Sequence, residues 1–259
     1  MTRYRALENS SLCPPESPAE AGLMTRKIVI IEHHDELRED LASLHLQHQG
    51  FAVEWCQPFK GQSLSPPDDA LAGAVILGGA PNVDQMDRSP FLYDEVRWIE
   101  QCLKLDIPTL GLCLGAQLIA HTLGAKVAPH ADGAEEFGFY EILPSADAPG
   151  FVPDGFLAAQ YHGRGFEIPS GAVSLARGEL FPNQAFRFGQ KVVGTQFHPE
   201  CTQAMWRRWQ AFPEAPWHKP GAQSRDEQNR LAEATLARAG EWFIEFLDQL
   251  FPPTLSQSA

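Results

Sequence analysis

The sequence predicts an α/β protein with a mostly parallel open sheet, helices on both faces, an antiparallel extension and C-terminal helices. Apolar runs of strand length alternate with segments of helical period over the first half of the chain. The links between them are short, which favours parallel strands joined by covering helices. From about residue 126, short strands and turns replace this alternation. We therefore expect a flavodoxin-like core with antiparallel strands added to it.

The first β-helix-β unit occupies residues 27 to 55. Residues 27–31 are a continuous apolar run, typical of a strand buried on both faces. A helix is expected over 36–49, where Gly50 stands in the C-terminal cap position and one face carries three leucines, Leu37, Leu41 and Leu44. A short strand over 51–55 completes the unit.

The pattern then repeats. A strand over 71–77 runs into the glycine pair 78–79, and a further strand is expected over 107–112. Helices are expected over 91–105 and over 115–123. The buried side of the first of these helices should carry Phe91, Val96, Ile99 and Leu103.

The second half is predicted to form strands followed by helices. Strands over 184–188 and 191–197 flank Gly189-Gln190, a two-residue connection suited to a hairpin. Helices are expected over 204–212 and 225–251. The longer one carries a stripe of core residues at helical spacing: Leu231, Thr235, Ala239, Trp242, Phe246 and Leu250.

The chain of 259 residues suits one large domain. We expect that domain to span 26–251, with the C-terminal helices of 203–251 packed on it. Residues 1–25 contain three prolines and no sustained apolar period, so we expect a mobile arm. Residues 252–259 begin with two prolines and form a tail.

Composition excludes several classes of protein. The chain has 20 Lys+Arg against 33 Asp+Glu, a net charge of −13, which argues against a nucleic-acid partner. No apolar run approaches the roughly 18–20 residues needed to cross a bilayer, and the N-terminus lacks a signal-peptide core. We therefore expect neither a membrane partner nor secretion.

The cysteines point to a reducing, cytoplasmic location. Their number is odd and no two have CxxC spacing, which argues against a disulfide framework and a structural zinc site: Cys13, Cys56, Cys102, Cys113 and Cys201. At most one of these thiols should carry chemistry.

That thiol is Cys113, within the sequence Gly111-Leu112-Cys113-Leu114-Gly115. A nucleophile between two such glycines, after a strand and before a helix, is typical of a nucleophile elbow. The turn should expose the sulfur at a helix N-terminus, where the helix dipole favours the thiolate. The backbone N–H of Leu114 is a natural donor to an oxyanion.

Two further signals concern the same chemistry. His198 and Glu200 lie at the end of a strand, two positions apart, so their side chains project to one side. Glu200 can therefore accept a hydrogen bond from one imidazole nitrogen of His198, while the other imidazole nitrogen faces Cys113, as in a catalytic triad. The pair Gly78-Gly79 follows another strand, where a second backbone N–H can approach a substrate oxygen.

These motifs, in this order, resemble the class I (triad-type) glutamine amidotransferase family, and most closely its stand-alone members similar to the amidotransferase domain of GMP synthase. The resemblance spans about 27–209. It includes several shorter matching segments: 136–139, 161–163, 166–169 and 183–186.

The resemblance implies a cysteine hydrolase or amidotransferase whose substrate is glutamine or another γ-glutamyl compound. Cys113 would form a γ-glutamyl thioester, with His198 as acid and base and Glu200 as its partner. The oxyanion donors would be the N–H groups of Gly79 and Leu114. Further substrate contacts would come from Gly78, Gln117, Tyr161, Gly163 and Arg164.

Two departures from the family pattern leave the substrate open. Arg164 replaces an aspartate and would repel an α-ammonium group but attract a carboxylate; Ala80-Pro81 replaces a leading proline. A γ-glutamyl peptide or amide hydrolase on the same triad is therefore an alternative, as is a non-catalytic binding or regulatory protein. The sequence shows no synthase domain and no nucleotide-binding P-loop. If the reaction supplies ammonia, another polypeptide, such as a separate synthase subunit, would use it, and the acceptor of the ammonia is unknown.

Other polar residues receive ordinary roles. His33 and His34 have no matching third ligand, so we expect no metal, and no other cofactor is implied. We expect His162 not to be the catalytic base. Glu135 and Glu136 should face opposite ways on a solvated strand edge.

Overall fold

A computed structural model describes residues 26–68 and 70–253. The expected arm over 1–25 and the tail beyond 253 lie outside the described residues. Five strands form the parallel half of a nine-stranded sheet: β1 (Lys27–Ile31), β2 (Ala52–Cys56), β3 (Leu71–Ile76), β4 (Thr109–Leu112) and β11 (Val192–Thr195). Their order is β2-β1-β3-β4-β11, and each neighbouring pair is parallel. This is the flavodoxin-like order, so the predicted core is confirmed.

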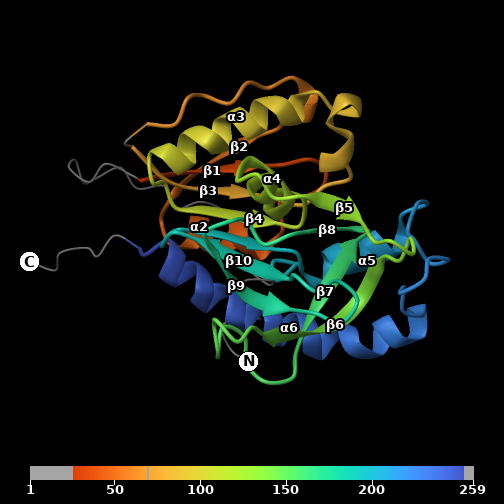
Figure 1. The fold of residues 1–259 in the computed structure, drawn as a ribbon. Coiled ribbons are helices and arrows are strands. Elements are labelled where there is room, and N and C mark those ends of the chain that lie inside the picture. Colours follow the sequence, from red (N-terminus) through yellow and green to blue (C-terminus); the bar gives the residue numbers. More distant parts are fainter. Residues whose placement is uncertain (1–25, 69, 254–259) are drawn as a thin grey trace, which may run out of the picture.

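Antiparallel strands continue the sheet beyond β11, so the sheet as a whole is mixed (Figure 1). In spatial order they are β10 (Ala185–Phe188), β9 (Ala172–Arg177), β6 (Glu136–Pro144) and β7 (Phe156–His162). The predicted hairpin is β10–β11, but its connection is three residues long, because Phe188 pairs with Val192. A separate two-stranded ribbon joins β5 (Val127–Pro129) and β8 (Arg164–Phe166).

Helices cover both faces of the sheet (Figure 1). One face carries α3 (Phe91–Lys104) and α4 (Leu114–Thr122). The other carries α2 (Leu41–His48) and α6 (Arg225–Leu250). The short helix α5 (Gln203–Ala211) packs on β6, and two 3-10 turns, η1 (Pro58–Lys60) and η2 (Val83–Arg88), lie in loops. Within the described ranges, no helix combines the length and apolar character needed to cross a membrane.

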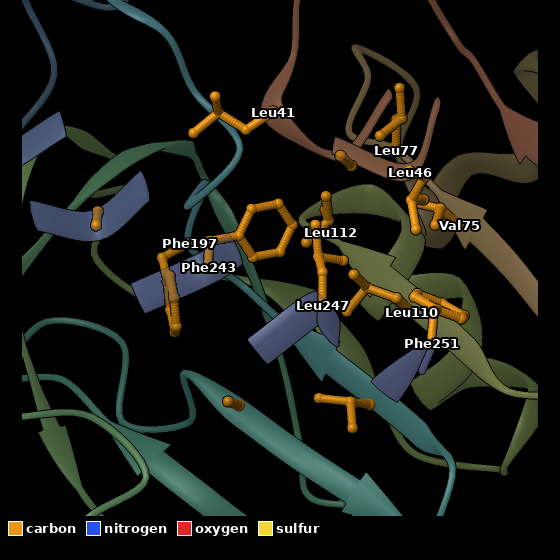
Figure 2. Packing of buried hydrophobic residues seen from close by; sticks show 14 of the residues in the cluster. Leu41, Leu46, Val75, Leu77, Leu110, Leu112, Phe197, Phe243, Leu247 and Phe251 are labelled. Atoms are coloured by element: carbon orange, nitrogen blue, oxygen red, sulfur yellow. The ribbon is translucent and has the colours of Figure 1, made fainter. Parts of the chain in front are cut away.

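Successive side chains along the buried strands point to opposite faces of the sheet, so the core has two layers. Ile28 and Ile30 of β1 face α2 and α6, whereas Val29 and Ile31 face α3 and α4. Figure 2 shows the first layer, in which leucines from β4 and α2 meet the aromatic and leucine side chains of α6. Since both faces are covered, β1 needs an unbroken apolar sequence, which is why it could be recognised from sequence.

Three helices differ from the predictions. In α6, Thr235 and Ala239 are buried, but the other predicted core residues are half-buried. The helix expected over 36–49 begins at Leu41, because the Asp40 side chain accepts a hydrogen bond from the Ser43 N–H and caps it. Leu37 therefore lies outside the helix and is 70% exposed rather than buried. In α3, Ile99 is buried, but the other predicted core residues are half-buried; the inner face is shifted and carries Leu92, Glu95, Trp98, Ile99 and Cys102.

The capping carboxylate of Asp40 should limit stability. Burial raises its pKa from 3.8 to about 6, although the hydrogen bonds from Ser43 oppose this. The folded state therefore binds the proton more tightly than the unfolded state, so stability falls as pH rises from about 4 to 6 and stays reduced above. Asn is an equally good cap without the charge. Asp40→Asn should raise the free energy of unfolding by about 2–3 kcal/mol at pH 7.5.

Urea denaturation at pH 4 and pH 7.5 checks this expectation. The gain from Asp40→Asn should nearly vanish at pH 4, where the wild-type carboxyl is protonated in the folded state. Asp40→Ala serves as the comparison, because it removes the charge together with the cap. Equal stability of wild type and Asp40→Asn at pH 7.5 would contradict the assigned burial cost.

Candidate active site

A cavity of about 310 Å³ lies at the carboxyl ends of the parallel strands, where ligands bind in open α/β sheets. Loops after β3, β4 and β11 contribute Gly78, Cys113 and His198, respectively. Another part of the wall comes from the end of β7 and the start of β8, which carry Tyr161 and Arg164, respectively. The structure therefore brings all of the predicted site residues to one cavity.

Cys113 occupies the strained turn between β4 and α4. Its backbone has φ 51° and ψ −105°, a conformation that non-glycine residues rarely adopt. Gly115 lets the turn close, because a Cβ there would lie 2.0 Å from the carbonyl oxygen of Ile76. The prediction of an exposed sulfur was wrong: Cys113 is only 5% exposed, since the walls of the cavity enclose it.

Strand pairing brings His198 to the cysteine. Leu112 at the end of β4 pairs with Thr195 at the end of β11, and the Cys113 N–H donates to the Thr195 carbonyl at 2.8 Å. Three residues later, the His198 N–H donates to the carbonyl of Ala159 in β7 at 2.9 Å. The backbone on both sides of the cavity is therefore fixed by hydrogen bonds between strands.

The imidazole of His198 lies between a carboxylate and the thiol. His198 Nδ1 is 2.7 Å from Glu200 Oε1, and the ring of His198 and the side chain of Cys113 both lie against Gly78. Burial alone would lower the pKa of His198, but the charges of Glu200 and Cys113 outweigh it and raise the pKa to about 10. The edge of the ring packs against Trp209, at 4.8 Å between centroids. This geometry favours a protonated imidazole next to the sulfur.

The residues predicted to donate backbone N–H groups line the cavity together with Cys113. Leu114 is the first residue of α4, so its N–H has no acceptor within the helix. Gly78 lies against the reacting groups: a Cβ there would be 2.8 Å from His198 Cε1 and 3.5 Å from Cys113 Cβ. Gly79 also lines the cavity. Both residues predicted to supply oxyanion donors, Gly79 and Leu114, therefore border the same cavity.

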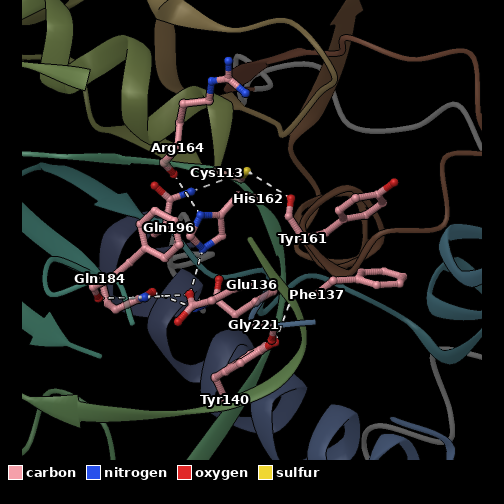
Figure 3. Close-up of polar contacts among 12 residues, drawn as sticks. Cys113, Glu136, Phe137, Tyr140, Tyr161, His162, Arg164, Gln184, Gln196 and Gly221 are labelled. Carbon is pink, nitrogen blue, oxygen red and sulfur yellow. Dashed lines mark hydrogen bonds and ion pairs between the residues drawn. The ribbon is translucent and has the colours of Figure 1, made fainter. Parts of the chain in front are cut away.

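Gln117 is held by protein groups in this structure. Its amide nitrogen donates to the Arg164 carbonyl at 3.1 Å and to Gln196 Oε1 at 3.2 Å. Gln196 in turn donates to Cys113 Sγ at 3.6 Å, while the carbonyl of Tyr161 lies 4.0 Å from the same sulfur (Figure 3). Gln196 was not predicted from the sequence, although it stands two residues before His198, on the same side of an extended chain.

A second histidine–carboxylate pair lies behind the wall (Figure 3). His162 Nε2 is 2.9 Å from Glu136 Oε2, and His162 Nδ1 is 2.8 Å from the Arg164 carbonyl. Gln184 also donates to Glu136, at 3.1 Å. Glu136 is 1% exposed, so the expectation of a solvated edge was wrong for this residue; the β6–β7 pairing places it opposite His162. Both ring nitrogens of His162 are engaged away from Cys113.

The side chain of Arg164 also has a partner. Its Nε lies 3.2 Å from Asp84 Oδ1 in η2, and both side chains are about a quarter exposed. Glu135 and Glu214 also line the cavity; burial, together with the charges of these two residues, raises the pKa of Tyr161 to about 12. Gly163 lies next to Glu135, since a Cβ on it would be 2.7 Å from Glu135 Cγ. This end of the cavity therefore carries both signs of charge.

The raised pKa of His198 predicts the alkaline limit of activity. A histidine that must protonate a leaving group loses that capacity as pH rises through its pKa, so kcat/KM should fall near pH 10. Protonated His198 also stabilises the fold. This stabilisation is fully present below about pH 6.5 and is lost as pH rises through about 10. Glu200→Gln should move the fall in kcat/KM to lower pH by about a unit or more. If kcat/KM of Glu200→Gln fell at the same pH as that of the wild type, Glu200 would not be responsible for the raised pKa of His198.

An elbow cysteine beside an imidazole that a carboxylate orients is the arrangement of enzymes that transfer acyl groups through a cysteine thioester. A family model described as glutamine amidotransferase class-I matches residues 29–208. The chain belongs to this family, which is one of amidohydrolase and amidotransferase enzymes.

Individual relatives agree with the family match. A subunit of the glutamine-hydrolyzing GMP synthase of Natronomonas pharaonis is 28% identical over 185 residues, which cover 68% of this chain and 89% of the relative. The glutamine-hydrolyzing GMP synthase of Streptococcus equi subsp. equi is 35% identical over 186 residues, 70% of this chain and 34% of the relative. The crystal structure of a glutamine amidotransferase from Thermotoga maritima has a TM-score of 0.77 at 27% identity, covering 89% of this chain and 100% of that one.

Proposed function

We propose that the protein hydrolyses the side-chain amide of glutamine through a γ-glutamyl thioester on Cys113 and releases ammonia for another reaction. The observation that carries this proposal is that Cys113, in a strained elbow, lines the same cavity as His198, whose ring is held by Glu200. The cavity of about 310 Å³ is at the small end of the range for small-molecule sites, which suits a substrate of amino-acid size.

The reaction divides into two halves. In the first, the Cys113 sulfur attacks the amide carbon, and His198 protonates the departing ammonia. In the second, His198 removes a proton from water, which attacks the thioester and releases glutamate. The N–H groups of Gly79 and Leu114 stabilise the oxyanion in both halves, each contributing about 10²–10³ in rate.

The other end of glutamine would lie against the wall between β7 and β8. The backbone of Tyr161, Gly163 and Arg164 lines the cavity there, as do Gly78 and Gln117. The carboxylates of Glu135 and Glu214, in the same wall, offer the negative charge that an α-ammonium group requires. Glu135 and Glu214 thus supply the negative charge that Arg164 cannot supply.

A γ-glutamyl peptide or amide hydrolase is the second candidate, and Arg164 favours it. Arg164 lines the cavity, and its guanidinium could exchange Asp84 for the carboxylate of a γ-glutamyl peptide. The leaving group would then be an amine or amino acid in place of ammonia, with the same thioester on Cys113. The two candidates differ in the leaving group and share the chemistry at the sulfur.

A substrate panel tests the function. Release of glutamate from glutamine, γ-glutamyl dipeptides and γ-glutamyl amides should be measured for wild type and Arg164→Asp. A glutaminase should have its highest kcat/KM with glutamine, and Arg164→Asp should preserve or improve it. A peptide hydrolase should prefer dipeptides and lose about tenfold on them in the variant. No turnover, with Cys113 left unlabelled by a diazo-ketone glutamine analogue, would point instead to the non-catalytic binding protein.

The partner and the location are also proposals. Two relatives, from Natronomonas pharaonis and Haloarcula marismortui, are named as one subunit of GMP synthase. These names support delivery of ammonia to a separate synthase subunit, with an acceptor still to be identified. Free thiols at Cys56, Cys102, Cys113 and Cys201 support a reducing, cytoplasmic setting.

A further inference from the structure

Beneath the Gly78-Gly79 turn lies another histidine–carboxylate pair, formed by His33 and Glu95, that the proposed reaction does not use. His33 follows β1, and Glu95 lies 62 residues later on the inner face of α3. His33 Nε2 is 2.8 Å from Glu95 Oε2, and His33 Nδ1 is 3.3 Å from the carbonyl oxygen of Gly78. Both side chains are 0% exposed.

The contact with Gly78 fixes which nitrogen of His33 is protonated. A carbonyl oxygen accepts hydrogen bonds and cannot donate them, so Nδ1 must carry its hydrogen. The proton between Nε2 and Glu95 can reside on either partner without changing this. In both cases the ring donates from Nδ1 to the Gly78 carbonyl, and Glu95 holds the ring in the required orientation.

The Gly78 carbonyl and the Gly79 N–H belong to one peptide unit. No cis peptide occurs in the described part of the chain, so the two groups point in opposite directions across a planar unit. With the carbonyl directed at His33, the Gly79 N–H is directed away from His33. Both glycines of this peptide line the cavity. A Gly-Gly peptide rotates more freely than any other, because neither residue has a Cβ. Its orientation therefore needs a restraint from outside the turn.

Glu95 is difficult to explain by packing alone. Its Oε1 has no hydrogen-bond partner in the described residues, although the group is buried among the apolar residues of α3. Burying a carboxyl with one oxygen unsatisfied costs free energy that an apolar side chain would avoid. The cost is understandable if the carboxyl is needed to orient the ring of His33.

We propose that His33 and Glu95 are positioning residues that hold the Gly78–Gly79 peptide with the Gly79 N–H facing the cavity. The oxyanion donor is then in place before substrate binds, and catalysis gains because no reorganisation is needed during the reaction. With the peptide rotated, a carbonyl oxygen would face the developing negative charge and oppose it. This inference rests on the function proposed above.

The test compares His33→Leu with His33→Asn. Leucine removes the donor, whereas the side-chain amide of asparagine can take the place of Nδ1–H. His33→Leu should lower kcat for glutamine by about 10- to 100-fold, a partial loss of one oxyanion donor, with KM within about twofold of wild type. His33→Asn should recover most of that loss. Alkylation of Cys113 by iodoacetamide, which needs no oxyanion donor, should proceed at the wild-type rate in both variants.

A control removes another histidine–carboxylate pair, in which the histidine is buried and the carboxylate is partly exposed. His45 of α2 is 2.6 Å from Asp248 of α6, outside the residues that line the cavity. His45→Leu should lower the thermal midpoint as His33→Leu does, yet leave kcat unchanged. The proposal would be overturned by wild-type kcat in His33→Leu, by an equal loss in His33→Asn, or by parallel loss of kcat and iodoacetamide labelling.

A crystal structure of His33→Leu separates this proposal from the proposed function. The Gly78–Gly79 peptide should be rotated or should occupy two orientations in the variant, against one in wild type. This result does not depend on which substrate is hydrolysed. If wild type turned over none of the γ-glutamyl compounds, the proposed function would fail on its own. A single unchanged peptide orientation in the variant would overturn the positioning role.

Discussion

Cys113→Ala should abolish hydrolysis of every γ-glutamyl compound, with a loss of at least about 10⁴-fold, because no other group at the site can form the thioester. Stability should change little. Alanine removes one buried sulfur atom but keeps the backbone of the elbow, including its φ of 51°. Cys113→Gly should be inactive too and more stable than Cys113→Ala, by up to about 1 kcal/mol, since glycine adopts positive φ without strain.

Release of ammonia and glutamate, together with thermal unfolding, measures both effects. Cys102→Ala provides the control, because that thiol is fully buried in α3, and burial raises its pKa to about 12. It should cost stability through the cavity it leaves, but retain activity. Substantial residual hydrolysis in Cys113→Ala, or loss of activity in Cys102→Ala, would be evidence against the assignment of the nucleophile.

His198→Asn should lower kcat by about 10³-fold or more. Asparagine can still donate a hydrogen bond to Glu200, but it has no group that transfers protons to and from the leaving group. The variant also removes the positive charge beside the sulfur, so alkylation of Cys113 by iodoacetamide should slow markedly. Steady-state kinetics and the labelling rate, determined by mass spectrometry of the Cys113 peptide, check the two expectations separately.

His162→Asn distinguishes His162 from His198, which lines the same cavity. The ring of His162 is engaged by Glu136 and the Arg164 carbonyl, so its replacement should disturb the substrate-binding wall and raise KM. Its effect on kcat should be less than about tenfold. A loss of kcat as large as that of His198→Asn would reassign the general base.

Most of the elements that were predicted could be recognised from short patterns of apolar residues in the sequence. The strand over 27–31 was predicted with its correct ends, because a strand covered on both faces must be apolar throughout. The long helix α6 was predicted to within one residue, since its apolar period extends over 26 residues. The start of α2 was missed because the cap at Asp40, rather than the apolar period, determines where that helix begins.

The candidate site was predictable to the extent that its residues stand in short motifs. Cys113 and the pair His198 and Glu200 could be identified because an elbow and an i, i+2 spacing have local geometric consequences. Glu136 gave no such signal. In sequence it resembled a solvated acid, and its burial follows from the pairing of β6 with β7, which brings His162 opposite it.

The amino-acid sequence by itself determined the order of strands and helices, the elbow and the residues able to do the chemistry. Tertiary structure alone decided how those residues are supported: Gln196 beside the sulfur, and Glu95 behind His33. The reason is physical. A motif records the backbone geometry of a few consecutive residues, whereas a hydrogen bond between residues 62 positions apart depends on which strand and helix pack together.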